Sequence, residues 1–556
     1  MTMKRRVRNA QYPPPHLAIA IAAAAGLAVA QPALGAEFDT GNPDLKLRWD
    51  NTVKYSAAAR VQGRNPRLVG DINLDDGDRN FGEGLISSRT DVLSELELTY
   101  RNRFGARVSG ATWYDSAYQR RNSHDAPWTA NQTSVPFNVF PKGTRKLHGG
   151  TGEILDAFVF GNTEVLDMPL TVRLGRHTLL YGETLFLGAN GIANAQAPVD
   201  AVKALSVPGS QFKEIILPVN QLSLQLQPRP NLAIGGYYQF EFRKSRIPGV
   251  GSYFSNTDLF DKGGENLLFA PGVMAPRAPD LRASNRGQFG MQVRWRPSGM
   301  DTEFGAYAVR YHDKIHQTYV RPLGLPAPGG LGAGFPLDYQ LVYPEGIRSY
   351  GLSFSTSVGD FNVAGEASVR RNTPLVSGAE LITTPGLVGG IGNNALYAVG
   401  NSAHLNLSAM YAFPRTALFD GGMLLGEVGW NRRTSITKNP QALDPNASRD
   451  ALGFRVIFEP QWFQVLPQLD LSMPLSLGYN PRGKSSVVQQ FNGGAHKGGD
   501  ISVGLKGTFQ QRWRFGLTYT RFFGSAGPII GPDGSQTFRQ TLADRSFVSL
   551  SIQTTF

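Results

Sequence analysis

Three short segments of the chain have residue types and spacings that could support chemistry, and the first is glycine-rich. Gly478 to Ser485 matches the phosphate-binding loop of nucleotide hydrolases letter for letter. That loop binds phosphate only where a strand leads in and a helix leads out, because backbone amides and the helix N-terminus surround the anion. Residues 486–499 have no helical periodicity and contain four glycines. We therefore expect a basic loop here and no nucleotide site.

The second segment is acidic. Asp71, Asn73 and Asp75 alternate along the chain, and oxygen ligands in such a pattern suit Ca²⁺. Gly77 comes one residue later than an EF-hand requires, and no helical pattern flanks the segment. The sequence leaves two interpretations open, a calcium site formed by these three residues and a solvated acidic turn.

The third segment contains His312 and His316, which share one face of a strand because they are four residues apart. Two histidines are fewer than the three or four ligands of a zinc site. No Gly-x-Ser-x-Gly elbow occurs either, so no local motif pairs a serine with a histidine. We expect no metal at these histidines, no cofactor and no enzymatic activity, although distant residues could still assemble a catalytic site.

The N-terminus has the three parts of a secretory signal peptide. Lys4, Arg5, Arg6 and Arg8 precede an apolar run at 17–30, and small residues follow at 33–36. The run is too short for a membrane anchor, so we predict a signal peptide at 1–36. Its removal takes four charges from a net charge of +12. Export argues against nucleic acid as the partner of this basic chain, and favours an anion-attracting interior or anionic lipid headgroups.

The C-terminus predicts a strand with one apolar and one polar face. Val548, Leu550, Ile552 and Phe556 alternate with polar residues, and the chain contains no cysteine. A last strand that ends in phenylalanine is similar to the signal that the barrel-assembly machinery reads in outer-membrane proteins. Signal peptide and terminal strand together favour a barrel in the outer membrane of a Gram-negative bacterium over a soluble sheet.

The same alternation recurs along the whole chain. We predict eighteen strands, near 45–60, 89–100, 104–119, 151–162, 169–181, 218–228, 231–243, 284–296, 301–314, 347–358, 361–372, 402–413, 420–433, 450–459, 468–479, 499–510, 513–523 and 543–556. Short turns and long segments alternate between them, as periplasmic turns and extracellular loops do in outer-membrane barrels. The predicted fold is an all-β, transmembrane antiparallel β-barrel of about 18 strands (16–20) over residues 37–556.

A barrel of this size leaves a water-filled lumen that something must narrow. Residues 182–217 are unusually apolar for an outer loop, and Pro198 begins a short helical pattern within them. We expect this loop to fold into the lumen, with a flexible outer loop as the alternative. Its polar residues that could line a constriction are Glu183, Asn190, Asp200 and Lys203.

Strand alternation also directs a set of charged side chains toward the lumen, where they would set selectivity. The alternative is that they pair across strands and only stabilise the wall. The set is Glu95, Glu97, Arg173, Glu241, Arg243, Arg294, Lys506 and Arg514.

Several segments are shared with one known family. They are Asp76 to Phe81, Leu93 to Glu95, Arg173 to His177, Gly182-Glu183, Pro198 to Asp200, Pro208-Gly209, Phe212 to Glu214, Leu217 to Asn220 and Asp544 to Leu550. The chain resembles the proteobacterial outer-membrane family called domain of unknown function thirteen-oh-two. The resemblance implies an outer-membrane barrel, commonly encoded beside a second periplasmic or outer-membrane protein and an RND-type permease, among genes for degrading lipids, steroids or terpenoids.

Three functions fit these observations. The first is a channel or transport barrel for bulky or hydrophobic organic molecules, working with a periplasmic partner and an inner-membrane permease. The second is a structural or surface-interaction barrel whose outer loops bind partners. The third is an outer-membrane lipid-modifying enzyme.

Overall fold

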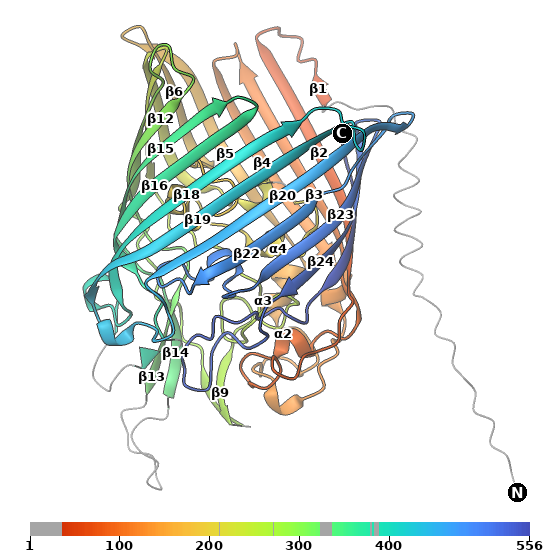
Figure 1. Ribbon diagram of the computed structural model, residues 1–556, viewed down its shortest axis with the longest axis vertical. Coiled ribbons are helices and arrows are strands. Elements are labelled where there is room, and N and C mark those ends of the chain that lie inside the picture. The colour runs from red at the N-terminus through yellow and green to blue at the C-terminus, as the bar shows by residue number, and fades with distance from the viewer. Residues whose placement is uncertain (1–35, 211, 271, 323–335, 379–380, 383–388) are drawn as a thin grey trace, which may run out of the picture.

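A computed structural model describes residues 36–556 except 211, 271, 323–335, 379–380 and 383–388 (Figure 1). The chain forms one closed antiparallel barrel of 18 strands. The barrel closes where the first long strand pairs with the last, from Thr52 opposite Thr555 to Arg60 opposite Phe547. The expected fold class is therefore confirmed. The predicted signal peptide lies outside the described residues except for Ala36.

The barrel strands follow one another in chain order, each paired with the next. They are β2 (Leu45–Arg60), β3 (Gly84–Tyr100), β4 (Phe104–Asp115), β5 (Gly150–Val165), β6 (Met168–His177), β7 (Val219–Arg229), β8 (Leu232–Gln239), β11 (Gln288–Trp295), β12 (Glu303–Tyr311), β15 (Ile347–Val358), β16 (Phe361–Pro374), β18 (Val399–Phe413), β19 (Gly421–Lys438), β20 (Asp450–Leu466), β21 (Leu469–Ser472) continued by β22 (Leu475–Gly483), β23 (Gly499–Phe509), β24 (Trp513–Phe523) and β25 (Phe547–Thr555).

Every predicted strand is present, with shifted ends. The predicted strand at 468–479 is interrupted after Ser472, and Pro474, which has no N–H to give to a ladder, lies in the gap. The glycine-rich stretch at Gly478 to Gly483 is the end of β22. The helix that a phosphate-binding loop needs does not follow it among the described residues.

Smaller elements accompany the barrel strands. They are β1 (Ala36–Phe38), β9 (Asn266–Ala270), β10 (Val273–Pro276), β13 (Gln317–Pro322), β14 (Pro336–Val342), β17 (Leu381–Ile382), α2 (Asp76–Arg79), α3 (Lys142–Thr144), α4 (Ala201–Ser206) and α5 (Phe212–Ile215). The first of them, β1, pairs with β2. Within the described ranges, no helix is both long and apolar enough to cross a membrane.

The two faces of the wall differ as the alternation predicts. On β18, the outward Leu405 and Leu407 are 47% and 49% exposed, whereas the inward His404 and Asn406 are each 3% exposed. A soluble sheet would bury the apolar face, but a barrel in lipid exposes it. The connections are segregated too, with the short turns at the end that holds the C-terminus and the long loops at the other (Figure 1).

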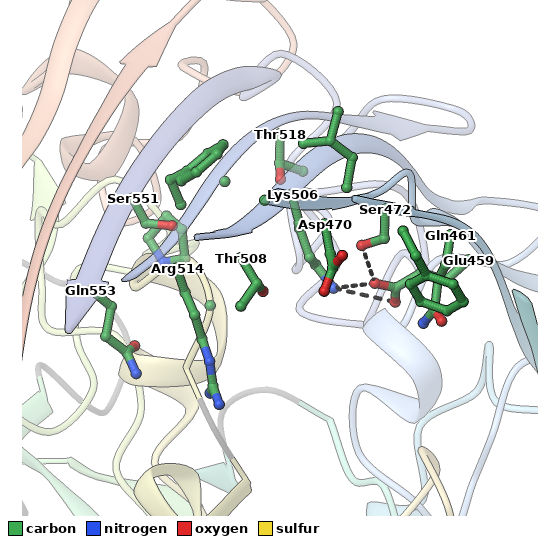
Figure 2. A pocket seen from close by; sticks show the side chains of 17 residues that line it. Glu459, Gln461, Asp470, Ser472, Lys506, Thr508, Arg514, Thr518, Ser551 and Gln553 are labelled. Atoms are coloured by element: carbon green, nitrogen blue, oxygen red, sulfur yellow. Dashed lines mark hydrogen bonds and ion pairs between the residues drawn. The ribbon is translucent and has the colours of Figure 1, made fainter. Parts of the chain in front are cut away.

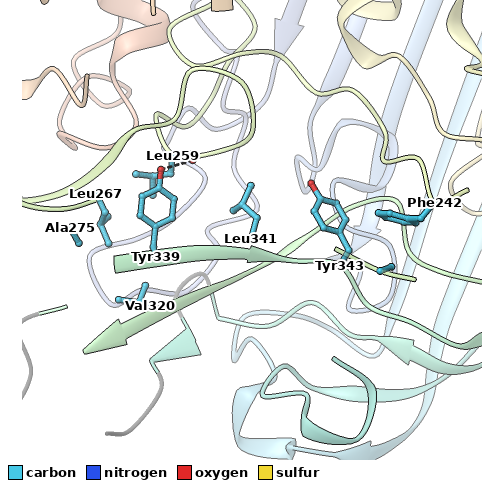
Figure 3. Packing of buried hydrophobic residues seen from close by; sticks show 9 residues of the cluster. Phe242, Leu259, Leu267, Ala275, Val320, Tyr339, Leu341 and Tyr343 are labelled. Carbon is cyan, nitrogen blue, oxygen red and sulfur yellow. Dashed lines mark hydrogen bonds between the residues drawn. The ribbon is translucent and has the colours of Figure 1, made fainter. Parts of the chain in front are cut away.

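The long loops pack into an ordered cap with an apolar core of its own. Phe242 and Leu259 from the loop after β8 pack with Val320 of β13 and with Tyr339 and Leu341 of β14 (Figure 3). The Tyr339 hydroxyl donates to the Leu259 carbonyl at 2.8 Å. These loops therefore hold defined positions over the barrel mouth.

A buried ion network joins this cap to the closing strand. Asp78 of α2 pairs with Arg60 at the end of β2 (3.0 Å) and with Arg545 just before β25 (3.2 Å). Arg60 also reaches Asp544 at 3.1 Å, and Arg545 donates to the Tyr253 carbonyl at 2.6 Å. Burial of these charges is tolerated only because each has a partner.

Replacing Arg545 with methionine should loosen the cap and leave the barrel intact, because Asp78 loses one of its two buried cations. We expect a cost of about 3 kcal/mol. Limited proteolysis in micelles should show faster cleavage of the loops at 61–83 and 240–287, with unchanged β circular dichroism. Arg539→Met, at an exposed position in the same loop, is the control. Equal cleavage in both variants would contradict this role of Arg545.

Candidate functional site in the barrel lumen

The loop between β6 and β7, residues 178–218, lies inside the barrel, and we call it the lumen loop. Its first half is bonded to Glu366 on the inward face of β16. The Glu366 carboxylate accepts the backbone N–H of Glu183 (2.7 Å) and of Ile192 (2.8 Å), and the hydroxyl of Thr184 (2.6 Å). Gly182 and Gly191 flank this contact, and a Cβ at either would collide with the carboxylate. Both glycines thus permit the close approach.

A second carboxylate, Glu427 of β19, holds the tip of the loop. It accepts the backbone N–H groups of Phe186 and Leu187, the latter at 2.7 Å. Arg370 of β16 supplies the opposite charge, donating to the carbonyls of Asn190 and Gly191 at 2.8 Å. Wall charges thus satisfy both the donors and the acceptors of this turn, as buried backbone requires.

Asn190 is fully buried against the same wall. Its amide donates to Asn406 (2.8 Å) and accepts from Asn431 (3.2 Å) and His404 (3.0 Å). In the sheet order, β18 and β19 lie across the barrel from β6 and β7, where the loop begins and ends. The loop therefore spans the lumen.

The second half of the loop contacts a different part of the wall. Lys213 pairs with Glu95 of β3 at 2.6 Å, and Glu214 pairs with Lys54 of β2 at 3.2 Å. Lys203 is buried with its ammonium 5.6 Å from the ring centre of Trp113 on β4. Two widely separated arcs of the barrel are thus joined through one loop.

The short helix expected after Pro198 is α4, which begins at Ala201. Asp200 caps it by accepting the Lys203 N–H at 3.0 Å, and its other oxygen pairs with Arg246 at 2.6 Å. Arg246 also binds Glu153 of β5. The helix position is therefore fixed by an N-cap and by an ion pair to Arg246, which is itself bound to Glu153 of the wall.

Several of the predicted lumen charges pair with a residue of a neighbouring strand or with the lumen loop. Glu95 and Glu97 share Arg107 of β4, and Arg294 pairs with Glu303 of β12. The alternative interpretation, that these charges pair across strands and stabilise the wall, therefore holds for Glu95, Glu97 and Arg294.

The remaining predicted residues are more scattered. Arg173 lies on β6 with its guanidinium 6.0 Å from the ring centre of Phe158. Glu241 and Arg243 were expected on a strand, but β8 ends at Gln239 and both lie in the loop beyond it. There Glu241 accepts from the side chain of Asn220 at 2.9 Å.

Lys506 and Arg514 line a cavity of about 460 Å³ at the short-turn end of the lumen (Figure 2). Lys506 pairs with Glu459 of β20 at 3.2 Å, and Asp470 lies nearby. Arg514 is exposed toward the cavity, and the contacts of the described residues include no ion pair for it. Pro208 and Gly209 bring the lumen loop to the edge of this cavity.

One triad-like arrangement lies where the loop meets β18. Nε2 of His404 accepts a hydrogen bond from the Ser402 hydroxyl at 2.7 Å. Its Nδ1–H donates to the side-chain oxygen of Asn190 at 3.0 Å. The geometry is that of a nucleophile and its base. All three residues are at most 3% exposed, so a substrate carbonyl cannot reach the serine while the loop is in place.

The other sequence candidates have structural partners. Oδ1 of Asp71 accepts the Asn73 N–H at 2.9 Å, and the Asn73 side-chain oxygen accepts from Asn131 and Leu268. His312 accepts the Gly346 N–H at 3.1 Å. His316 packs on Phe260 with 4.5 Å between ring centres.

Sequence reasoning missed Glu366, Arg370 and Glu427, the three wall charges that hold the loop. Each lies on the inward side of an alternating strand, as do the charges that the sequence analysis predicted to line the lumen. The available signal was a charged residue at an inward-facing position of a predicted strand. Nothing in the sequence showed which inward charges meet a loop far away in the chain.

Neutralising the free positive charge of the cavity should change ion selectivity. We expect Arg514→Gln combined with Lys506→Gln to shift the reversal potential toward cation preference, because Glu459 and Asp470 then dominate the cavity. The measurement is a bilayer recording under a salt gradient. Arg103→Gln, in the turn between β3 and β4, is the control and should have no effect. A reversal potential unchanged in the double variant would show that ions do not pass this cavity.

Comparisons with solved structures find barrels of similar extent. OccAB4 of Acinetobacter baumannii is 8% identical, with a TM-score of 0.40 over 93% of this chain and 100% of that one. OpdK of Pseudomonas aeruginosa, solved with vanillate, is 8% identical, with a TM-score of 0.40 over 92% of this chain and 98% of that one. A BenF-like porin of Pseudomonas fluorescens Pf-5 is 7% identical, with a TM-score of 0.41 over 92% and 98%. Similarity at this level carries no argument about function.

No curated protein matches the chain. A family model does, and it extends over residues 16–556, nearly the whole sequence. Several of the segments that resemble this family have structural roles here. Asp78 and Arg545 pair in the cap, and Gly182 and Lys213 position the lumen loop. The chain belongs to the protein family of unknown function DUF1302.

Proposed function

We propose that this protein is a passive outer-membrane channel constricted by the lumen loop. The observation that carries the proposal is the bonding of residues 183–192 to Glu366, Arg370 and Glu427 on the far wall. A loop held across a wide lumen narrows the path and leaves the wall unchanged. The apolar outer face and the separation of short turns from long loops support an outer-membrane location.

The proposed substrates are bulky or hydrophobic organic molecules. The cavity of about 460 Å³ is within the size range of sites for small organic ligands. Phe463 and Leu471 add apolar surface to its polar lining. Such a molecule would meet apolar surface and charges of both signs on the short-turn side of the lumen loop.

Transfer across the periplasm would need partners. On the family resemblance, we propose a periplasmic partner and an RND-type permease of the inner membrane that receive or supply the substrate. Assembly would depend on the barrel-assembly machinery reading Phe556, which follows the end of β25 and is 40% exposed.

A second function, surface interaction, is favoured by the packed cap. Flexible loops have no need of a core, whereas Leu267, Tyr339, Leu341 and Tyr343 are buried together outside the barrel. A rigid outer surface is suited to binding another molecule. We propose no enzymatic role, because the hydroxyl of Ser402 is enclosed by the lumen loop and is used in fixing His404 against Asn190.

Releasing the loop should open the channel. In the double variant Glu366→Gln and Glu427→Gln, each new amide NH₂ competes with the backbone N–H groups that the carboxylates accept. Charge-assisted hydrogen bonds contribute about 1.5–3 kcal/mol each, so losing two favours the released loop by roughly a hundredfold or more. We expect higher single-channel conductance in planar bilayers, approaching that of a deletion of residues 185–212.

Glu97→Gln is the matched control, since Glu97 is a wall carboxylate paired with Arg107, and should conduct like wild type. Equal conductance in wild type, the double variant and the deletion would place the constriction elsewhere. No conductance from any of them would refute the channel and leave surface interaction as the better account.

A further inference from the structure

Three aspartates from two loops meet inside the cap, away from the lumen. Asp75 and Asp76 lie at the start of α2, and Asp258 lies in the loop between β8 and β9. Each is at most 1% exposed. One oxygen of each lies within 4.8 Å of one oxygen of each of the others. Gly77 allows this approach, because a Cβ there would collide with the carbonyl of Ser255.

Each carboxylate is oriented by a protein group through one of its oxygens. Oδ2 of Asp75 accepts from Nε of Arg79, and Oδ2 of Asp258 accepts the Asp76 N–H at 3.2 Å. Oδ1 of Asp76 lies 2.8 Å from Nε2 of His124. The other ring nitrogen of His124, Nδ1, accepts the backbone N–H of Ala126 at 3.2 Å, so the proton is on Nε2 and is donated to Asp76.

The second oxygen of each carboxylate has no partner. Oδ1 of Asp75, Oδ2 of Asp76 and Oδ1 of Asp258 are all buried without a hydrogen bond. Burial and the charge of Asp76 raise the pKa of Asp75 to about 7, and burial, with the charges of Asp76 and Asp75, raises that of Asp258 well above its ordinary value. A buried oxygen that lacks a donor costs free energy, and each of the three aspartates that meet here has one such oxygen.

We propose that Asp75, Asp76 and Asp258 bind one Ca²⁺ that ties the outer loops together. Ca²⁺ takes oxygen ligands at 2.3–2.6 Å, so ligand oxygens around it are up to about 5 Å apart, which the cluster satisfies. Mg²⁺ demands near-ideal octahedral geometry, whereas Ca²⁺ accepts the irregular arrangement of three carboxylates from two loops. His124 is a positioning residue, since it orients one ligand without touching the ion.

The site would join two loops directly and a third through His124. The two are residues 61–83 and 240–287, and the third is 116–149. Extracellular calcium would then rigidify the cap over the barrel mouth, whether or not the lumen conducts. The inference therefore stands apart from the proposed channel function.

The test is calorimetric titration of CaCl₂ into the full-length, EDTA-treated protein in detergent, together with proteolysis of the loops with and without Ca²⁺. We expect one Ca²⁺ per chain and slower cleavage of loops 61–83 and 240–287 when it is bound. Asp258→Asn removes one charged ligand without changing its shape, and should weaken binding by on the order of tenfold or more. In EDTA this variant should resist protease better than wild type, because the repulsion among the carboxylates is reduced.

Asp444→Asn is the matched control. Asp444 is a fully buried aspartate of another outer loop, and both its oxygens accept backbone N–H groups, from Asn446 at 2.9 Å and Gln536 at 2.7 Å. This variant should bind Ca²⁺ like wild type, even if its loop is less stable. No heat and no protection in wild type, equal binding by Asp258→Asn, or protection by Mg²⁺ in preference to Ca²⁺ would each overturn the proposal.

Discussion

The structure depends on three charged side chains of the barrel wall. They form the hydrogen bonds that water would otherwise make with the backbone of a loop in the lumen. Glu366 and Glu427 accept backbone N–H groups of residues 183–192, and Arg370 donates to carbonyls of the same turn. Without them the turn would bury unsatisfied backbone groups, which costs several kcal/mol in total. With them, a loop that begins after β6 can place its tip against β19 before it returns to β7.

Ion pairs that match opposite charges also lie at both ends of the barrel. In the cap, Asp78 lies between Arg60 and Arg545 and fixes the outer loops to the seam where β2 meets β25. At the short-turn end, Lys506 and Glu459 pair beside an open cavity. The cavity of about 460 Å³ lies on the short-turn side of the lumen loop.

Alternation predicted the wall well because every second strand residue faces lipid, and this signal is local. The limits of β2, β15 and β24 follow from it residue by residue. The lumen loop was predictable from its apolar composition and length. Its anchors were not, because Glu366 lies far from Glu183 in the chain and only closure of the barrel brings them together. The same holds for Asp258, which joins the acidic segment at Asp75 from a distant loop.

The most direct test of the loop's position uses the absence of cysteine from the chain. Asn190→Cys and Asn406→Cys replace two side chains that are 2.8 Å apart, and both carboxylate anchors are kept. Oxidation in intact outer membranes should cross-link this pair, but not Asn190→Cys with Asn362→Cys, which lies at the short-turn end of the neighbouring strand β16. The chain is then cleaved between the two positions. A disulfide keeps the two fragments together as one species, and this species is the readout. Failure of the first pair to link, while each cysteine alone reacts with a soluble thiol reagent, would show that the loop does not cross the lumen.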